Sequence, residues 1–254
     1  MITIKSKEEI QLMRESGRIA AQILKKVQDI VKPGISTKEL NDLAEKLIAK
    51  YKVKSAFKGY SSGKNGELFP GVLCTSLNNV VVHGVPSDVA LKEGDILGLD
   101  FGVVYKGYYS DLAVTVPVGN IRDEARHLIR VTRKALKRGL KKVRPGNTIG
   151  DIGNTIQRYV ESQGYEVVRD LCGHGIGRAL HEEPEIPNLG KRRTGPELAE
   201  GMVIAIEPMV VTGSWELEYS TDNYGFETKD KSLSAHFEHT VAVTKDGCEV
   251  LTVL

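Results

Sequence analysis

The sequence predicts an α+β fold built from two related halves, with helices on one side of a mostly antiparallel sheet. Three pairs of similar segments occur in the same order along the 254-residue chain. They are VKPGISTKEL (31–40) with VRPGNTIGDI (143–152), EGDILGLD (93–100) with EGMVIAIE (200–207), and DLAVTV (111–116) with EHTVAV (238–243). One such match would be chance, whereas three in one order indicate an internal duplication.

A helix is predicted before each Pro-Gly turn and another after it. In the first half, apolar residues between Ile10 and Val31 recur three and four positions apart, which makes one apolar stripe. The corresponding helix of the second half runs from about Asp123 to Lys142. After each turn, a Ser or Thr precedes an acid by three residues, the capping-box spacing that starts a helix. These pairs are Ser36 with Glu39, and Thr148 with Asp151.

Each remaining segment is a predicted strand that carries a carboxylate. Asp100 ends the apolar run ILGL and Asp111 opens the next strand, with a plausible hairpin turn, YKG (105–107), between them. We therefore expect the two acids to lie nearly opposite each other on neighbouring strands. By the repeat, Glu207 corresponds to Asp100 and Glu238 to Asp111. A pseudo-two-fold axis would bring all four acids together.

The two halves are expected to form one catalytic domain. The stretch that joins them, PVGNIRD (117–123), is a short turn and not a linker. We predict a single domain over 1–254, with pseudo-repeats at about 5–118 and 119–250. Two small independent α/β domains are the alternative.

The composition excludes several classes of protein. Hydrophobic residues form 41% and charged residues 27% of the chain, so disorder, collagen-like repeats and coiled coils do not describe the whole. A net charge of +2 is too balanced for nucleic acid as the main partner. The 3 cysteines form no CxxC pair and favour reduced thiols. With neither a signal peptide nor a membrane-spanning run, we expect a cytoplasmic monomer without membrane contact.

Four buried carboxylates cannot share a site without cations, because like charges would force most of them to bind protons. A carboxylate that ends an apolar run would also cost several kcal/mol if it were buried unpaired. Two divalent ions about 3.5–4 Å apart, bridged by carboxylates, remove this conflict. The alternative is that the four acids are unrelated surface or salt-bridged residues. Their matched positions in the two halves argue against it.

His174 is the remaining candidate metal ligand, in the glycine-rich segment LCGHGIGRALHEEP. Flanking glycines allow tight backbone conformations that expose an imidazole. Two rival motifs fail here, since Arg178 stands where GxGxxG needs a glycine and Pro184 would break the helix of an HExxH motif. One nitrogen among oxygen ligands favours manganese, iron or cobalt over a structural zinc.

Two more histidines, His83 in VVVHGVP and His181, seven residues after His174, flank the predicted metal site in sequence. We expect them to act in catalysis and not as ordinary structural hydrogen bonders. His236 and His239 bracket Glu238. At the period of a strand, His239 points away from Glu238 and His236 shares its face, so both are expected to be structural or to support the ligands.

Together these motifs resemble the type I methionine aminopeptidases over essentially the whole chain. The resemblance rests on VVVHGVP, LDFG, YYSDLAVT, CGHGIGRALHEEP, AIEPM and HFEHT. It implies the pita-bread fold, in which a curved, mostly antiparallel sheet covered by helices surrounds a metal site on the pseudo-two-fold axis. The short spacing between His181 and Glu207 leaves no room for the insertion of type II enzymes.

The resemblance implies a ligand set for two divalent ions, which would be cobalt, manganese, iron or zinc. Asp111 and Glu238 would bridge both ions. His174 and Glu207 would complete the coordination of one ion, and Asp100 that of the other.

The resemblance also implies the reaction, removal of the N-terminal methionine from nascent or newly made proteins. A metal-bridging hydroxide would attack the carbonyl after the first residue. Glu207 is the candidate for moving the proton. His181 would stabilise the oxyanion, and His83 would assist the scissile amide; both match histidines that contact the substrate.

An unbranched thioether fits an irregular apolar pocket lined by aromatic side chains and a thiol. The candidate residues for this methionine pocket are Phe57, Tyr60, Phe69, Cys74, Leu180 and Tyr224. The segment FKGYSSGKNGELFPGVLC (57–74) is longer than usual for the resembled family, which affects the shape of the pocket more than the reaction.

Three alternatives stay open. A prolidase or proline-specific aminopeptidase of the same fold would usually carry a large additional N-terminal domain. A non-catalytic binding module would be expected to lose ligand residues, and all five are present. The basic segment KALKRGLKKVR (134–144) is either a solvated helix face or a contact with ribosomal RNA, which would suit a co-translational enzyme.

Overall fold

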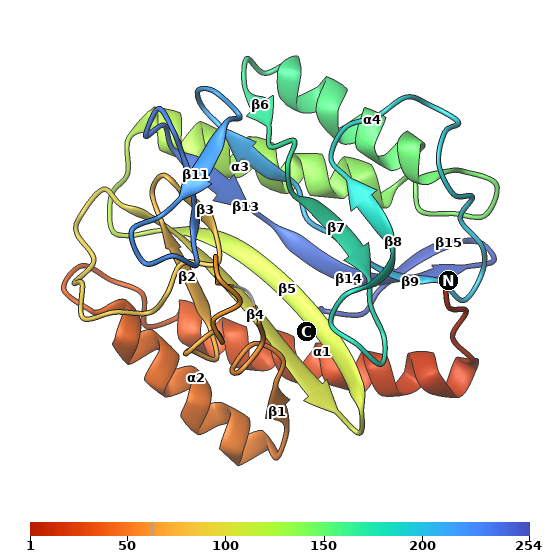
Figure 1. Ribbon diagram of the computed structural model, residues 1–254, viewed down its shortest axis with the longest axis horizontal. Helices are drawn as coiled ribbons and strands as arrows, with labels where there is room; N and C mark the ends of the chain where they lie inside the picture. The colour runs from red at the N-terminus through yellow and green to blue at the C-terminus, as the bar shows by residue number, and fades with distance from the viewer. Residues whose placement is uncertain (62) are drawn as a thin grey trace.

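The computed structural model describes residues 1–61 and 63–254, so Ser62, within the segment 57–74, lies outside the described residues. Its helices are α1 (Lys7–Gln28), α2 (Thr37–Tyr51), α3 (Asp123–Leu140) and α4 (Ile149–Glu161). In the view of Figure 1, α1 and α2 lie below the strands and α3 and α4 lie above them, each pair against its own half of the curved sheet. Within the described ranges, none of the helices is both long and apolar enough to cross a membrane.

The strands form one large sheet and two small ones. The large sheet runs in the order β1 (Lys54–Ser55), β4 (Ile96–Tyr105), β5 (Tyr108–Pro117), β14 (Glu238–Thr244), β9 (Val203–Ile206), β7 (Cys172–Gly175) and β8 (Glu182–Pro187). In addition, β2 (Cys74–Leu77) pairs with β4, and β15 (Gly247–Val250) with β14. The small sheets are β13 (Ser234–His236), β10 (Met209–Val211) and β6 (Glu166–Val167), and β11 (Leu217–Tyr219), β12 (Phe226–Thr228) and β3 (Val80–Val82).

The strand order shows the predicted internal duplication. The matched segments 93–100 and 200–207 contribute β4 and β9, and the segments that begin at Asp111 and Glu238 contribute β5 and β14. Exchanging the two halves replaces β4 with β9 and β5 with β14, and the order β4-β5-β14-β9 then reads the same in reverse. The pseudo-two-fold axis passes between β5 and β14, which pair antiparallel at Glu238 and Ala113. All pairings between the described strands are antiparallel.

Both predicted capping boxes are present. The Glu39 carboxylate accepts a hydrogen bond from the Ser36 backbone amide at 2.8 Å, and the Asp151 carboxylate accepts one from the Thr148 amide at 2.9 Å. The helices before the Pro-Gly turns are shorter than expected, because α1 ends at Gln28 and α3 ends at Leu140. Val31, the last residue of the apolar stripe in the first half, therefore lies in the connecting turn, where it packs against the core.

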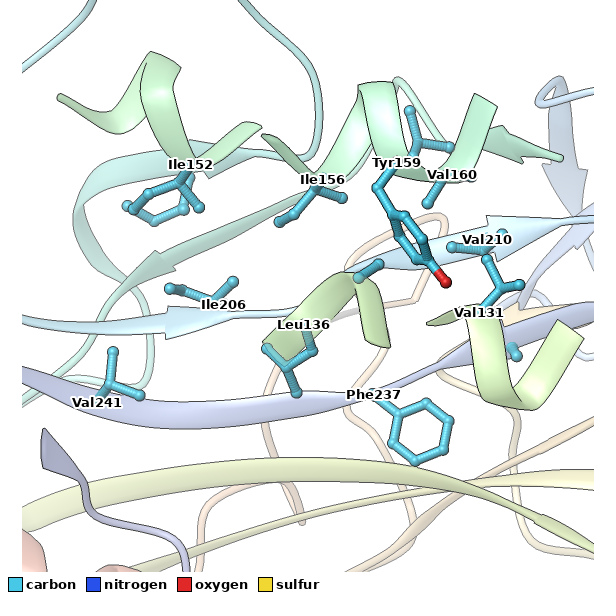
Figure 2. Packing of buried hydrophobic residues seen from close by; sticks show 14 of the residues in the cluster. Val131, Leu136, Ile152, Ile156, Tyr159, Val160, Ile206, Val210, Phe237 and Val241 are labelled. Atoms are coloured by element: carbon cyan, nitrogen blue, oxygen red, sulfur yellow. The ribbon is translucent and has the colours of Figure 1, made fainter. Parts of the chain in front are cut away.

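The helices cover one face of the sheet, and the acids lie on the other. Along β4, Leu97, Leu99, Phe101 and Val103 pack with apolar residues of α1 and α2, whereas Asp100 alternates to the opposite face. In the second half, α3 and α4 cover β9 and β14 in the same way. Figure 2 shows Ile206 and Val241 facing Leu136, Ile152 and Ile156. Fully burying each such side chain contributes about 1.5–3 kcal/mol, so the helix layers hold the curved sheet in place.

The hairpin of β4 and β5 differs from the expected register. Its turn is Lys106–Gly107, both with positive φ (48° and 83°), as a two-residue hairpin turn requires. Tyr105 then pairs with Tyr108, which places Asp100 opposite Ala113 and Asp111 opposite Gly102. The two acids are therefore diagonal neighbours on one face, two positions apart, and not directly opposite each other.

Candidate metal centre and substrate pocket

The four predicted acids line one pocket, although they come from four different strands or strand ends. Asp100 lies in the middle of β4, Asp111 in β5 and Glu238 at the start of β14, and Glu207 follows β9 directly. Asp100, Asp111 and Glu238 are only 8%, 4% and 2% exposed. The duplication has thus placed four carboxylates around its pseudo-two-fold axis, as the sequence predicted.

Two hydrogen bonds between β5 and β14 fix the position of Asp111. The Asp111 amide donates to Thr240 Oγ1 at 2.9 Å, and the Thr240 hydroxyl donates to the Asp111 carbonyl at 2.8 Å. Asn188 supports Glu207 similarly, because its Nδ2 donates to the Glu207 carbonyl at 2.9 Å. Sequence reasoning missed Thr240 and Asn188, and only the threonine has a local signal, its position on the same face as Glu238.

His174 lies in β7, and a backbone contact fixes the orientation of its ring. Its Nδ1 lies 2.9 Å from the Gly175 carbonyl oxygen, which assigns the proton to Nδ1 and leaves the Nε2 lone pair free. Nε2 lies 3.8 Å from Glu207 Oε1. One ligand atom each from Asp111, His174 and Glu238 lies within 4.8 Å of the others. These three residues therefore form a compact cluster of possible metal ligands.

Burial raises the pKa values of three acids in the cluster, and neighbouring carboxylates add to this effect. Burial and the neighbouring carboxylates raise the pKa of Asp111 and of Glu238 well above the usual range. Burial raises the pKa of Asp100 to about 6. Among the described residues, Asp100 Oδ1, Asp111 Oδ1 and Glu238 Oε1 are buried without a hydrogen-bond partner. Buried oxygens without donors and one free imidazole nitrogen fit a site for divalent cations.

His236 lies against Glu207, at 3.4 Å between Nε2 and Oε2. Burial alone would raise the pKa of Glu207, but its contact with His236 and the nearby His174 lower it overall. This position agrees with the expectation that His236 supports a ligand. His239 points away from the acids, and its Nδ1 lies 2.9 Å from Thr252 Oγ1.

His83 and His181 also line the pocket. His83 has a φ of 60°, a left-handed backbone that is uncommon for a residue other than glycine and occurs often at functional sites. Burial lowers its pKa. The His181 ring lies 4.4 Å from the His174 ring between centroids, and its Nδ1 lies 2.6 Å from the Tyr60 hydroxyl. Desolvation and His174 lower the pKa of His181 to about 4, so its imidazole is neutral.

A small, mostly apolar recess lies directly beside the acid cluster. The pocket has a volume of about 60 Å³. Its apolar walls are buried side chains, namely Phe57, Phe69, Cys74, Val82 and Leu180. Tyr60 also lines it, whereas Tyr224 does not line it and instead packs edge-on against Phe69 at 5.9 Å between ring centroids. Val82 was missed, because a valine inside an apolar strand has no sequence signal that separates it from the core.

The sequence profile of metallopeptidase family M24 matches residues 11–245. The chain belongs to this family. It is 46% identical over its full length to a methionine aminopeptidase of Clostridium perfringens, all of which it covers. The crystal structure of a methionine aminopeptidase from Thermotoga maritima is 43% identical and superposes with a TM-score of 0.96, with 100% of both chains covered.

A prolidase from Pyrococcus furiosus is similar in fold alone. It is 24% identical, with a TM-score of 0.78 over 99% of this chain and 65% of its own. The M24 chain described here is therefore a metal-dependent peptidase of pita-bread fold, whose full-length relatives are methionine aminopeptidases. Membership of a metallopeptidase family also agrees with the fit of the acid cluster to divalent cations.

Proposed function

We propose that this M24 metallopeptidase removes the N-terminal methionine from nascent or newly made proteins. The observation that carries the proposal is the adjacency of two features, the acid cluster and the small recess walled by Phe57, Phe69 and Leu180. The apolar walls and the acids line one pocket of about 60 Å³, and an unbranched side chain suits such walls. The enzyme would therefore act on the first residue of a chain.

The proposed metal site holds two divalent ions, of cobalt, manganese, iron or zinc. Asp100, Asp111, His174, Glu207 and Glu238 would hold these ions. Four carboxylates balance the charge of two divalent cations, which explains how so many buried acids are tolerated. When bound, such ions act as Lewis acids on a carbonyl oxygen and lower the pKa of a coordinated water.

Tyr60 and His181 form a unit that presents a hydrogen-bond donor. Burial raises the pKa of Tyr60, so its hydroxyl keeps its proton and donates to Nδ1 of the neutral His181. The remaining proton of the His181 ring is then on Nε2. An N–H held in this way can stabilise the negative charge that develops on the scissile carbonyl oxygen.

Glu207 and His83 complete the proposed machinery. The lowered pKa of Glu207 keeps its carboxylate ionised, as a group that accepts a proton must be. The buried Nδ1 of His83 has no hydrogen-bond partner among the described residues. Because the His83 side chain lines the pocket, its ring would assist the scissile amide of a bound peptide.

The proposed enzyme is a single catalytic domain over 1–254 that acts as a cytoplasmic monomer. A groove along α3 supports a contact with the ribosome, because seven basic side chains and Thr155 line it. The basic residues are Arg130, Arg133, Lys134, Lys137, Arg138, Lys141 and Lys142. Such a concentration of positive charge fits the phosphate backbone of ribosomal RNA.

The activity is tested by reconstituting the protein with each metal and comparing hydrolysis of Met-Ala-Ser and Ala-Pro-Ala. Release of methionine from the first peptide alone is expected. Preference for the second would identify a proline-specific enzyme. Bound metal is measured by mass spectrometry on the same samples, and failure to bind any divalent ion would favour a non-catalytic binding module.

The ribosome contact is tested by cosedimentation at increasing salt. We expect binding that weakens with salt and is lost when Lys134, Lys137 and Lys141 are changed to Gln. A matched variant with Lys50, Lys52 and Lys245 changed to Gln removes equal charge elsewhere. Equal binding by both variants would exclude this surface.

A further inference from the structure

A second groove opens from the catalytic pocket and extends along β7 and β8. It has a volume of about 530 Å³. The groove and the catalytic pocket share five lining residues, Val82, His83, His174, His181 and Glu207. The groove is therefore continuous with the site where the peptide bond would be cleaved.

This continuity identifies the occupant, provided that the proposed function holds. When the first side chain fills the recess, the rest of the peptide must leave the site by another route. The groove is large enough for several residues, and an extended peptide advances about 3.3 Å per residue. His83, whose buried Nδ1 lacks a partner, lies where the recess and the groove meet.

The walls of the groove beyond the catalytic residues are acidic. Asp170, Glu182, Glu183 and Glu185 line it, and no lysine or arginine does so among the described residues. Glu182 is neutralised by Lys5, with 2.7 Å between Nζ and Oε2.

The other three carboxylates, those of Asp170, Glu183 and Glu185, are exposed and have no ion pair within the described part of the chain. The nearby cation Arg169 is engaged elsewhere. Its guanidinium contacts Glu166 at 3.6 Å and stacks on Trp215, with 4.8 Å to the ring.

We propose that Asp170, Glu183 and Glu185 select substrates with lysine or arginine shortly after the cleaved bond. Each carboxylate is solvated and free to pair with a side chain that projects from an extended peptide. Pairs of this kind are individually weak, but several act together along one strand of substrate. Acidic residues at the same substrate positions are repelled.

Three peptides that differ only after their third residue test the proposal. They are Met-Ala-Ser-Lys-Lys, Met-Ala-Ser-Gln-Gln and Met-Ala-Ser-Glu-Glu. We expect kcat/KM for the lysine peptide to exceed that for the glutamate peptide by about five- to twentyfold at low salt. The ratio should fall toward one near about 0.5 M salt, because exposed pairs are screened. Equal rates for the three peptides at low salt would overturn the proposal.

The double variant Glu183→Gln with Glu185→Gln should reduce the ratio to about threefold or less. A matched double variant, Glu161→Gln with Glu200→Gln, removes the same charge outside the groove and should keep the wild-type ratio. Equal loss in both variants would show that overall charge, and not this groove, sets the preference.

Binding of the product peptides provides a readout that does not depend on turnover. By calorimetry on the metal-loaded protein, Ala-Ser-Lys-Lys should bind about five- to twentyfold more tightly than Ala-Ser-Glu-Glu. If no methionine peptide is cleaved, the proposed function fails, and this difference in affinity still decides whether the groove selects basic chains. If the neutral peptide is cleaved and neither readout shows a preference, only the groove proposal fails.

Discussion

The hydroxyl of Tyr60 lies 2.6 Å from Nδ1 of His181, although the two residues are far apart in the chain. Their rings meet edge to face, at 5.2 Å between centroids and 86° between planes. Tyr60 therefore holds both the orientation and the tautomer of the imidazole at the mouth of the pocket. A residue expected to shape the methionine recess also positions a catalytic candidate.

Replacing Tyr60 with Phe should lower kcat about tenfold and change KM little. The substitution keeps the aromatic wall and removes only the hydrogen bond that holds His181, so stabilisation of the developing oxyanion is weakened. Steady-state kinetics with a Met-Ala-Ser peptide measures the effect. Tyr224→Phe is the matched control, because its hydroxyl donates to the Leu68 carbonyl and not to His181. A similar loss in both variants would contradict the role of Tyr60.

Replacing Asp111 with Asn should abolish turnover, by at least about a thousandfold, and reduce metal loading. The variant removes the charge of one proposed metal-binding carboxylate and keeps the shape of the side chain. Mass spectrometry after reconstitution measures bound metal, and kinetics measures turnover. Asp246→Asn is the control, since its side chain is 83% exposed. Full activity with normal metal content would refute the bridging role.

The apoprotein should be stabilised by Asp100→Asn increasingly as the pH rises. Burial raises the pKa of Asp100 to about 6, above the usual 3.8, so the protonated carboxyl stabilises the folded state at low pH. This stabilisation is complete below about pH 4 and is lost as the pH rises through about 6. Asparagine is neutral at every pH. The free energy of unfolding of the variant, relative to the wild type, should therefore rise by about 1–3 kcal/mol between about pH 5 and about pH 7.5.

Urea unfolding of the metal-stripped wild type and variant at both pH values measures this difference. Three buried histidines, His83, His181 and His239, have lowered pKa values, so their contribution to the stability of the fold is lost as the pH falls. This effect runs opposite to that of Asp100, and for this reason the variant is compared with the wild type at each pH. Their contributions cancel in the difference. With metal bound, the order should reverse, and the variant should be the less stable. A difference independent of pH would show that Asp100 is ionised in the apoprotein.

Replacing Gly173 with Ala should destabilise the protein by about 1–3 kcal/mol and weaken metal binding. A Cβ at this position would overlap the Ala205 carbonyl oxygen of β9, so β7 would have to move and carry His174 with it. Thermal unfolding and metal titration measure the two effects. Gly98→Ala is the control, because its Cβ would meet the Ser76 side chain at 3.3 Å, a contact that small shifts relieve. An unchanged metal affinity for Gly173→Ala would contradict the idea that a shift of β7 displaces His174.

Much of the architecture was predictable because its signals are local or repeated. The capping boxes at Ser36 and Thr148 depend on residues three positions apart, and both helices start as predicted. The acids occupy matched positions on equivalent strands of the two halves. They meet because the pseudo-two-fold axis relates these strands to each other. The diagonal register of Asp100 and Asp111 was not predicted, since it depends on which two residues form the turn.

The sequence by itself determined which acids occupy matched positions of the duplication and which helices support their strands, because these follow from residue type and spacing. Only the tertiary structure decided that Tyr60 holds His181, that Thr240 holds Asp111, and that Tyr224 stands behind Phe69. It alone placed the acidic side chains of β8 along the groove that leaves the site. Such contacts join distant segments, and their distances depend on how the helix layers and the curved sheet pack.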